Sequence, residues 1–182
     1  MSKSALIIID AQSGMYNGEK IVPIFEGEQK IRKIKHLIEK ARSRGIILIY
    51  IQHDGDKGHP LEKGTRGWMI HSQILPIKGD LVIQKRHPDS FLHTQLQEVL
   101  ADLFVTNLYI AGNQTEYCID TTCKSAFSKG FQVLLIEDCH STWDTDILSA
   151  TQIIKHHNET LKNGYVTLKN SEKISFDEFE DL

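Results

Sequence analysis

The chain has 182 residues, of which 40% are hydrophobic and 25% are charged, and its formal net charge at pH 7 is −3. This length and composition are typical of one globular domain over 1–182, long enough to bury a sizeable core. The sequence has no basic block, and no apolar run approaches the roughly 18 residues that cross a bilayer, which excludes nucleic acid and membrane as expected partners. We expect a small-molecule substrate instead.

The predicted elements alternate between strands and helices. Strands are predicted at short, uninterrupted apolar runs, which are typical of strands covered on both faces. Helices are predicted where apolar residues recur every three or four positions. In chain order, the elements are a strand at 5–9, a helix at 28–44, strands at 46–51 and 81–83, a helix at 94–104, a strand at 108–111, a helix at 115–129, a strand at 133–136, a helix at 145–161 and a strand at 165–168.

Two of these helices show the apolar pattern clearly. In the first, Ile31, Ile34 and Leu37 lie on one face, and in the last a stripe runs from Ile147 to Leu161. Strands and helices that alternate in this way predict parallel pairing with helices on both faces. The expected fold class is therefore α/β, a three-layer α-β-α and Rossmann-like arrangement around a mostly parallel sheet of about six strands.

Two segments fit neither pattern. Residues 53–76 contain four glycines and two prolines and predict a long loop, and loops of that length are commonly functional or disordered. Residues 172–182 are rich in acidic side chains, and we expect them to form a frayed acidic tail.

The three cysteines are Cys118, Cys123 and Cys139, and no CxxC occurs. This low, odd count argues against a disulfide framework and a four-cysteine zinc site, and the missing CxxC argues against a thiol oxidoreductase. The apolar stretch before Asp10 is too short for a signal-peptide core. We therefore expect a cytoplasmic protein with free thiols.

Three chemically active residues follow different predicted strands. Asp10 ends the first strand, Lys85 follows the third, and Cys118 comes just after the fourth at the start of a helix. Because parallel strands end at the same edge of a sheet, we expect the three side chains to meet there. A helix N-terminus and an ammonium group both lower the pKa of a thiol, and a carboxylate can accept its proton.

Each of these residues also has a structural interpretation. An aspartate after a strand is commonly a turn former, and a lysine there is commonly solvated. A cysteine in a helix is commonly a small core residue, and we interpret Cys123 and Cys139 in that way. Spacing alone therefore leaves a catalytic and a structural role open.

The surrounding segments resemble the three signature segments of the isochorismatase-like cysteine hydrolase superfamily, which includes nicotinamidases, N-carbamoyl amidohydrolases and isochorismatases. The similar segments are 6–12, 82–91 and 111–123, and the most specific piece is Gly112-x-x-Thr115-Glu116-x-Cys118. The resemblance implies that Cys118 is the nucleophile, Asp10 the general base and acid, and Lys85 their electrostatic partner.

The same resemblance implies further features of the site. It places a cis peptide bond between Asn113 and Gln114, and an oxyanion hole made by the backbone N–H groups of Gln114 and Cys118. Side chains in or beside the similar segments and the long loop are candidates for substrate binding, and they are Gln12, His53, Trp68, Phe91 and Tyr117. Members of the superfamily are commonly assemblies, so we expect a homodimer or higher homo-oligomer.

Metal binding is the point at which the resemblance is weakest. Nicotinamidases often carry Asp-x-His after the second strand, whereas this chain has His53 followed by Asp54, and then His59 and His71. Imidazole and carboxylate suit zinc or iron, so a site at His53, His59 and His71 is one alternative. The other alternative, which we favour, is that these are loop residues and that no cofactor is needed.

The implied function is hydrolysis of an amide or other non-peptide C–N bond of a small molecule, through a thioester acyl-enzyme. One alternative is an isochorismatase-type vinyl ether hydrolase, whose chemistry does not need the thiol. Another alternative is a non-catalytic α/β interaction protein. A nucleotide-binding module is disfavoured, because no GxGxxG or GxxxxGK[ST] sequence follows any predicted strand.

Overall fold

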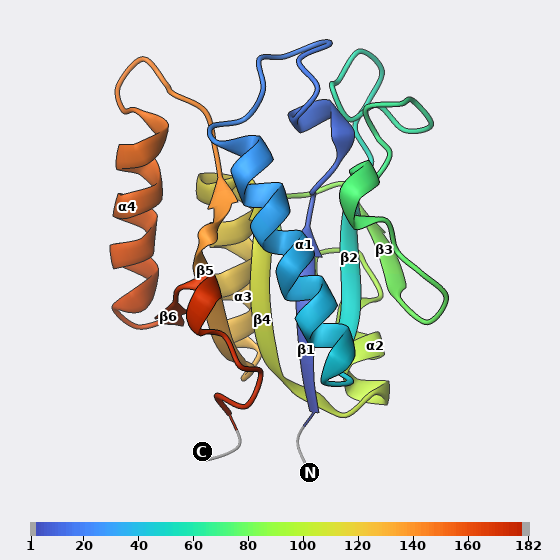
Figure 1. Cartoon of the computed structure of the whole chain (residues 1–182), viewed down its shortest axis with the longest axis vertical. Coiled ribbons are helices and arrows are strands. Elements are labelled where there is room, and N and C mark those ends of the chain that lie inside the picture. The colour runs from blue at the N-terminus through green and yellow to red at the C-terminus, as the bar shows by residue number, and fades with distance from the viewer. Residues whose placement is uncertain (1–2, 180–182) are drawn as a thin grey trace.

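Six parallel strands form a single sheet in the order β3-β2-β1-β4-β5-β6, with helices on both faces (Figure 1). The structure is a computed structural model, and it describes residues 3–179. The strands are β1 (Lys3–Ile9), β2 (Ile47–His53), β3 (Leu81–Lys85), β4 (Val105–Asn113), β5 (Gln132–Ser141) and β6 (Thr167–Lys169). The predicted α/β fold class is confirmed.

The helices divide between the two faces of the sheet. They are α1 (Gly27–Ser43), α2 (Leu96–Asp102), α3 (Asp120–Ser128) and α4 (Ala150–Lys162), with short turns at η1 (Ser13–Met15), η2 (Ser72–Ile74), η3 (Thr115–Ile119) and η4 (Ser171–Lys173). Helix α1 packs on one face, while α2, α3 and α4 contribute buried residues to the other. Within residues 3–179, none of these helices is both long and apolar enough to cross a membrane.

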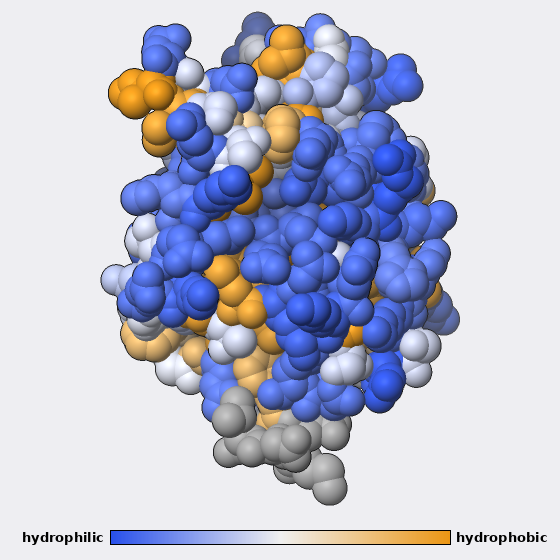
Figure 2. All heavy atoms as spheres, turned by 60° about the vertical axis from the view of Figure 1, so that its left-hand side comes forward, coloured by the Kyte–Doolittle hydropathy of each residue, from blue (hydrophilic) through white to orange (hydrophobic). Residues whose placement is uncertain are grey.

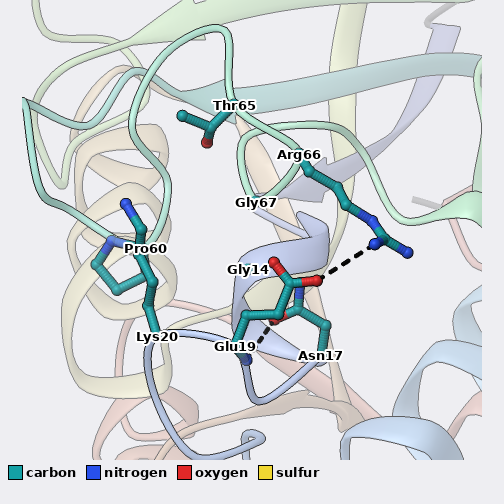
Figure 3. A pocket seen from close by; sticks show the side chains of 8 residues that line it. All are labelled: Gly14, Asn17, Glu19, Lys20, Pro60, Thr65, Arg66 and Gly67. Atoms are coloured by element: carbon teal, nitrogen blue, oxygen red, sulfur yellow. Dashed lines mark hydrogen bonds and ion pairs between the residues drawn. The ribbon is translucent and has the colours of Figure 1, made fainter.

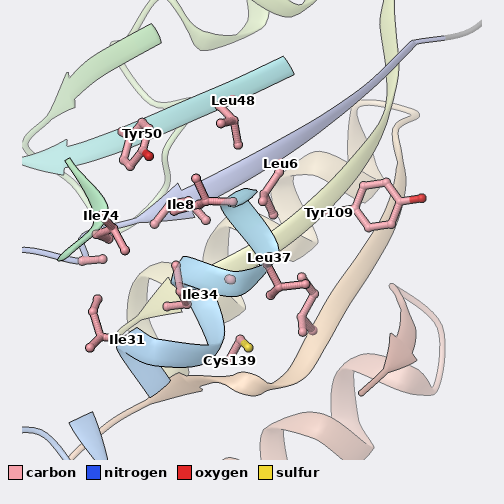
Figure 4. Close-up of a cluster of buried hydrophobic side chains, with 14 of the residues drawn as sticks. Leu6, Ile8, Ile31, Ile34, Leu37, Leu48, Tyr50, Ile74, Tyr109 and Cys139 are labelled. Atoms are coloured by element: carbon pink, nitrogen blue, oxygen red, sulfur yellow. The ribbon is translucent and has the colours of Figure 1, made fainter. Parts of the chain in front are cut away.

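The apolar face of α1 builds the first half of the core. Ile31, Ile34 and Leu37 are fully buried against Leu6 and Ile8 of β1 (Figure 4). Side chains alternate across a strand, so the neighbouring residues of β1 point to the opposite face and join the second half of the core. Strand β1 is therefore buried on both sides, which is why its sequence is continuously apolar.

The last long helix begins later than predicted. Ser149 forms a capping box with Gln152, and the Asp144 carboxylate accepts a hydrogen bond from the Ala150 N–H at 2.7 Å. These contacts fix the start of α4 at Ala150. The prediction of a helix from residue 145 is wrong, and Ile147, which is 87% exposed, belongs to a loop rather than to an apolar stripe.

The segment that precedes the C-terminus packs on the sheet rather than fraying. Ile174 and Phe176 are buried, and the rings of Phe176 and Tyr109 on β4 meet edge to face at a centroid distance of 4.8 Å. The Glu178 carboxylate accepts a hydrogen bond from the Tyr109 hydroxyl at 2.6 Å. The predicted frayed tail is therefore wrong for residues 172–179, because two apolar residues among the acidic ones complete the core; residues 180–182 lie outside the described part.

Candidate active site

Three strand ends deliver the predicted trio to one edge of the sheet. Asp10 follows β1 directly, Lys85 is the last residue of β3, and Cys118 lies in the π-helical turn η3 after β4. Strand β2 separates β3 from β1, so the Lys85 side chain reaches across the end of β2 toward Asp10. The sheet order thus explains how residues far apart in sequence share one place.

Lys85 contacts both of the other residues. Its Nζ lies 2.7 Å from Oδ2 of Asp10 and donates a hydrogen bond to Sγ of Cys118 at 3.1 Å. A further hydrogen bond runs to the carbonyl oxygen of His87, also at 3.1 Å. Asp10 and Lys85 are 1% and 2% exposed, so this charged pair is shielded from water.

Asp10 is held in an uncommon backbone conformation with its carboxylate open. Its φ of 49° lies in the left-handed region, and its N–H donates to the carbonyl oxygen of Ile51 at 2.9 Å. Both carboxylate oxygens are buried and accept no hydrogen bond of good geometry from residues 3–179, the Lys85 contact being an ion pair. Such a carboxylate is well placed to accept a proton from a neighbouring thiol.

The resting thiol is protonated, contrary to the expectation of a lowered pKa. Burial and the adjacent Asp10 carboxylate raise the pKa of Cys118 to about 12, and Lys85 opposes them only in part. Burial lowers the pKa of Lys85, but Asp10 and Cys118 outweigh it and leave that pKa raised. The predicted helix over 115–129 is present as the π-helical turn η3 followed directly by α3, and Cys118 lies in its first turn.

The turn between β4 and Cys118 is fixed from three sides. The Asn113–Gln114 peptide bond is cis, as the resemblance implied. Side chains of the three residues at this bond hydrogen-bond to three other segments: Asn113 Nδ2 to the Tyr16 hydroxyl at 2.5 Å, Gln114 Nε2 to Thr142 Oγ1 at 3.1 Å, and Thr115 Oγ1 with His140 Nδ1 at 2.9 Å.

Sequence analysis did not single out these three partners. Tyr16, His140 and Thr142 carry no motif, although the polar residues 140–142 stand out after the apolar run 133–136. Residues that extend a buried strand but break its apolar character are candidates for a site at the strand end. The break in apolar character at 140–142 is therefore the sequence signal for His140 and Thr142.

Two residues predicted to bind substrate have other roles. The Gln12 side-chain amide hydrogen-bonds to backbone groups. It donates to the carbonyl oxygens of His53 and Trp68 at 3.0 and 2.8 Å and accepts from the His53 N–H at 2.8 Å. The Phe91 ring is only 7% exposed and stacks on Phe131 in the core. Substrate binding by Gln12 and Phe91 stays a prediction, and in the structure their contacts are to backbone groups and to the core.

The other three candidates remain available. His53 has a buried Nδ1 without a partner among residues 3–179, and burial lowers the pKa of its imidazole. The indole N–H of Trp68 donates to Asp54 at 2.8 Å, which fixes the ring beside the end of β2. Tyr117 is 54% exposed and next to Cys118 in sequence. Substrate binding by these residues stays a prediction.

The potential metal ligands are dispersed. The rings of His53 and His59 lie 5.6 Å apart, but His71 packs instead against Tyr16. Asp54 already accepts hydrogen bonds from Trp68 and Lys63. Across the described residues, no three His, Cys, Asp or Glu side chains are grouped to hold a metal ion. The residues present therefore do not form the three-histidine site given as an alternative.

The long loop is packed tightly against the segment after β1. Gly14 and Gly67 approach the carbonyl oxygen of Pro60 so closely that an added Cβ would lie 2.4 and 2.2 Å from it. Figure 3 shows a pocket of about 70 Å³ at this junction, where Arg66 points toward Glu19. A second pocket, of about 260 Å³, lies beside the end of β3 and is lined by Asp54, Gln84, Lys85, Arg86, His87, Leu92 and His93.

Comparison with known proteins identifies the family. The family model of the Isochorismatase domain matches residues 4–158, and the chain belongs to this family. It is 31% identical over 140 residues to a streptothricin hydrolase of Streptomyces noursei, covering 77% of this chain and 55% of that protein. The chain thus spans about half the length of this relative.

Two further comparisons agree with this assignment. A ureidoacrylate amidohydrolase of Agrobacterium fabrum is 24% identical over 171 residues, covering 75% of each chain. A crystal structure of an isochorismatase family protein superposes with a TM-score of 0.84 at 29% identity, covering 92% of this chain and 98% of that one.

Proposed function

We propose that this protein is a cysteine-dependent hydrolase that cleaves an amide or other non-peptide C–N bond of a small molecule. The observation that carries the proposal is the position of Lys85 Nζ, which lies 2.7 Å from Asp10 and 3.1 Å from the Cys118 sulfur in a buried setting. A thiol, an unencumbered carboxylate and an ammonium group in mutual contact supply a nucleophile, a base and a counter-charge.

The first step moves the thiol proton to Asp10. Transfer from Sγ of Cys118 neutralises the carboxylate that raises the thiol pKa, so the thiolate forms beside an ammonium group and no longer beside a charge of its own sign. The thiolate then attacks the substrate carbonyl carbon, and the C=O electron pair moves onto oxygen. In this proposal the backbone N–H groups of Gln114 and Cys118, the pair that the family resemblance implies, donate to that developing oxyanion.

The second half of the cycle returns the proton. Collapse of the tetrahedral intermediate breaks the C–N bond, and the amine leaves with the proton held by Asp10. Water then attacks the thioester, giving one proton back to Asp10 while the thiolate departs. The acid is released, and the thiol is restored when Asp10 returns its proton to Cys118.

Two observations favour C–N cleavage over the vinyl ether alternative. The cysteine stands in contact with Lys85, whereas vinyl ether hydrolysis does not need a thiol. The relatives include a ureidoacrylate amidohydrolase, whose name specifies an amide substrate. The non-catalytic alternative has no comparable support, since a buried Asp–Lys pair whose carboxylate oxygens accept no hydrogen bond from residues 3–179 is costly to retain.

The test is turnover of a panel of small amides and N-carbamoyl compounds by the wild type and by two variants. Cys118→Ala removes the nucleophile and should abolish turnover. Asp10→Asn removes the base and should lower kcat by about 10²- to 10⁴-fold. A Cys118→Ala variant that still turns over the best wild-type substrate would contradict the proposal and favour the vinyl ether mechanism.

A further inference from the structure

His140 is a buried polar residue that the proposed mechanism does not use. It lies in β5, is 0% exposed and pairs in register with Gly112 of β4. Both nitrogens of its ring are hydrogen-bonded, Nδ1 with Thr115 Oγ1 and Nε2 with Asn158 Oδ1, each at 2.9 Å. Burying a polar ring costs free energy unless hydrogen-bond partners are supplied, whereas an apolar side chain at this position would need none. The imidazole therefore needs a functional or structural reason.

The hydrogen-bond network gives this chain of contacts a direction. Asn158 Nδ2 donates to the carbonyl oxygen of Glu137 at 3.2 Å, so its Oδ1 faces His140 and accepts the proton of Nε2. Nδ1 then has only a lone pair, and it accepts from the Thr115 hydroxyl. Burial lowers the pKa of His140 to about 4, so the ring stays neutral near pH 7 and this polarity is retained.

Thr115 connects this chain to the nucleophile. It is fully buried and is the first residue of η3, the turn that contains Cys118. On the other side of the cis bond, Asn113 is held by Tyr16 from the loop after β1. His140 is therefore an anchor on the downstream side of the bond, beside Thr142, and through Asn158 it ties the turn to α4.

We propose that His140 is a positioning residue, which fixes through Thr115 the turn that presents the Cys118 sulfur and the N–H groups of Gln114 and Cys118. It touches neither substrate nor the reacting atoms. The inference rests on the proposed function, because it assigns to His140 a part in orienting that nucleophile. A displacement of about 1 Å at a reacting group can cost on the order of a hundredfold in rate.

Two conservative replacements separate the two contacts of the ring. In His140→Asn, the side-chain oxygen can take the place of Nδ1 and still accept from Thr115. In His140→Gln, the side-chain nitrogen can take the place of Nε2 and still donate to Asn158. We expect His140→Gln to lose about tenfold to a hundredfold in kcat with little change in KM, and His140→Asn to retain most of the rate.

The matching pair at the other end is Thr115→Val, which removes the hydroxyl, and Thr115→Ser, which keeps it. The kcat of Thr115→Val should be lowered as much as that of His140→Gln, while the kcat of Thr115→Ser should be close to that of the wild type. Both substitutions remove the same hydrogen bond, the one between Thr115 and His140. The double variant Thr115→Val/His140→Gln should therefore be no slower than either single variant.

Stability is measured on all variants, with Tyr109→Phe as the control. Tyr109 is as buried as His140, and it lies on β4 four residues before Asn113. The Tyr109→Phe variant loses the hydrogen bond to Glu178, so it should be less stable while its kcat is unchanged. Equal kcat in His140→Asn and His140→Gln, or additive losses in the double variant, would overturn the inference. A wild type without amide turnover would instead overturn the proposed function.

Discussion

At the scale of single residues, the site is governed by one proton shared between Asp10 and Cys118. Lys85 neutralises whichever of the two is charged, because its Nζ contacts both. In the resting state the charge resides on the carboxylate, which together with burial keeps the thiol protonated. The nucleophile is thus formed only when Asp10 takes its proton.

This arrangement predicts that Asp10→Asn makes the thiol more reactive while it lowers turnover. Removing the carboxylate charge leaves Lys85 as the nearest charge, so the pKa of Cys118 should fall and iodoacetamide should alkylate it faster near pH 7. Lys85→Met should do the opposite. Cys118→Ser provides the background from Cys123 and Cys139, which are buried. Slower labelling in Asp10→Asn would contradict this account of the site.

His140 makes a second residue-scale prediction, this time about stability. Burial lowers its pKa from 6.5 to about 4; nearby Lys30 and His157 add to the effect, while Asn158 and Asp138 oppose it. Because the unfolded chain binds this proton first, stability is lost as the pH falls through the window from 6.5 toward 4.

Denaturant unfolding at pH 7 and pH 5 measures this effect. The His140 contribution to the free energy of unfolding should fall by about 2 kcal/mol over that interval. His140→Asn cannot take up the proton, so its pH dependence should be flatter by that amount. Parallel pH profiles for wild type and variant would show that His140 does not carry the linkage.

At the scale of elements, the strand ends determine the site, and Gly112 shows how closely they approach. Its φ is 127°, and an added Cβ would lie 2.0 Å from the carbonyl oxygen of Ile9, the residue before Asp10. Only glycine allows β4 to pass β1 at this distance. The glycine of the Gly112-x-x-Thr115 motif therefore has a packing reason in the neighbouring strand.

Gly112→Ala is expected to impair both folding and the site. The added methyl group forces β4 away from β1 where the backbone cannot yield cheaply, and alanine is strained at this φ. We expect the free energy of unfolding to fall by about 2–4 kcal/mol. We also expect that, in this background, Asp10→Asn no longer changes the rate at which iodoacetamide alkylates Cys118. Gly45→Ala is the matched control, since its φ is also positive but nothing lies within 4 Å of its Cβ.

Much of this element structure was predictable, and the failures have physical causes. The strand runs and the α1 stripe follow from burial, which selects apolar residues at fixed periods. The start of α4 was missed because Ser149 and Gln152 cap the helix after two apolar residues that mimic its stripe. Packing of Ile174 and Phe176 was missed because apolar residues in an acidic segment show no period.

The site divides in the same way. Asp10, Lys85 and Cys118 could be placed together because parallel strands end at one edge. The roles of Gln12 and Phe91 could not, because hydrogen bonding to backbone and burial beneath a neighbouring ring depend on loop paths that sequence does not encode locally. The predicted lowering of the Cys118 pKa does not occur, because burial and Asp10 together raise this pKa more than Lys85 lowers it.

At the scale of the whole molecule, the expected homo-oligomer stays a prediction. Figure 2 shows exposed apolar side chains at several places on this face, including the end of the molecule that carries the loops. Ile147, 87% exposed, and Val22, 68% exposed, are among the exposed apolar residues, and the Trp143 indole donates to the Val22 carbonyl oxygen at 2.7 Å. This patch is a candidate contact between copies.

Light scattering of Ile147→Glu tests that prediction. If the patch lies between subunits, the charge should reduce the mass of the particle at micromolar concentration, because a desolvated carboxylate opposes association. Ile77→Glu is the control, since Ile77 is 56% exposed and precedes the edge strand β3, whereas Ile147 follows β5, which lies beyond β2, β1 and β4 in the sheet. An unchanged mass for both variants would place any interface elsewhere.

The trio that forms the site also has a consequence for how the molecule acquires activity. Asp10, Lys85 and Cys118 come from β1, β3 and the turn after β4, and β3 and β4, although consecutive in the chain, are separated in the sheet by β2 and β1. Every pairing in the sheet needs a crossover, which makes such topologies slow to assemble. During refolding, the alkylation rate of Cys118 should therefore return to its native, Asp10-dependent value later than the far-UV circular dichroism signal recovers. The time of that return would report when the central sheet is complete.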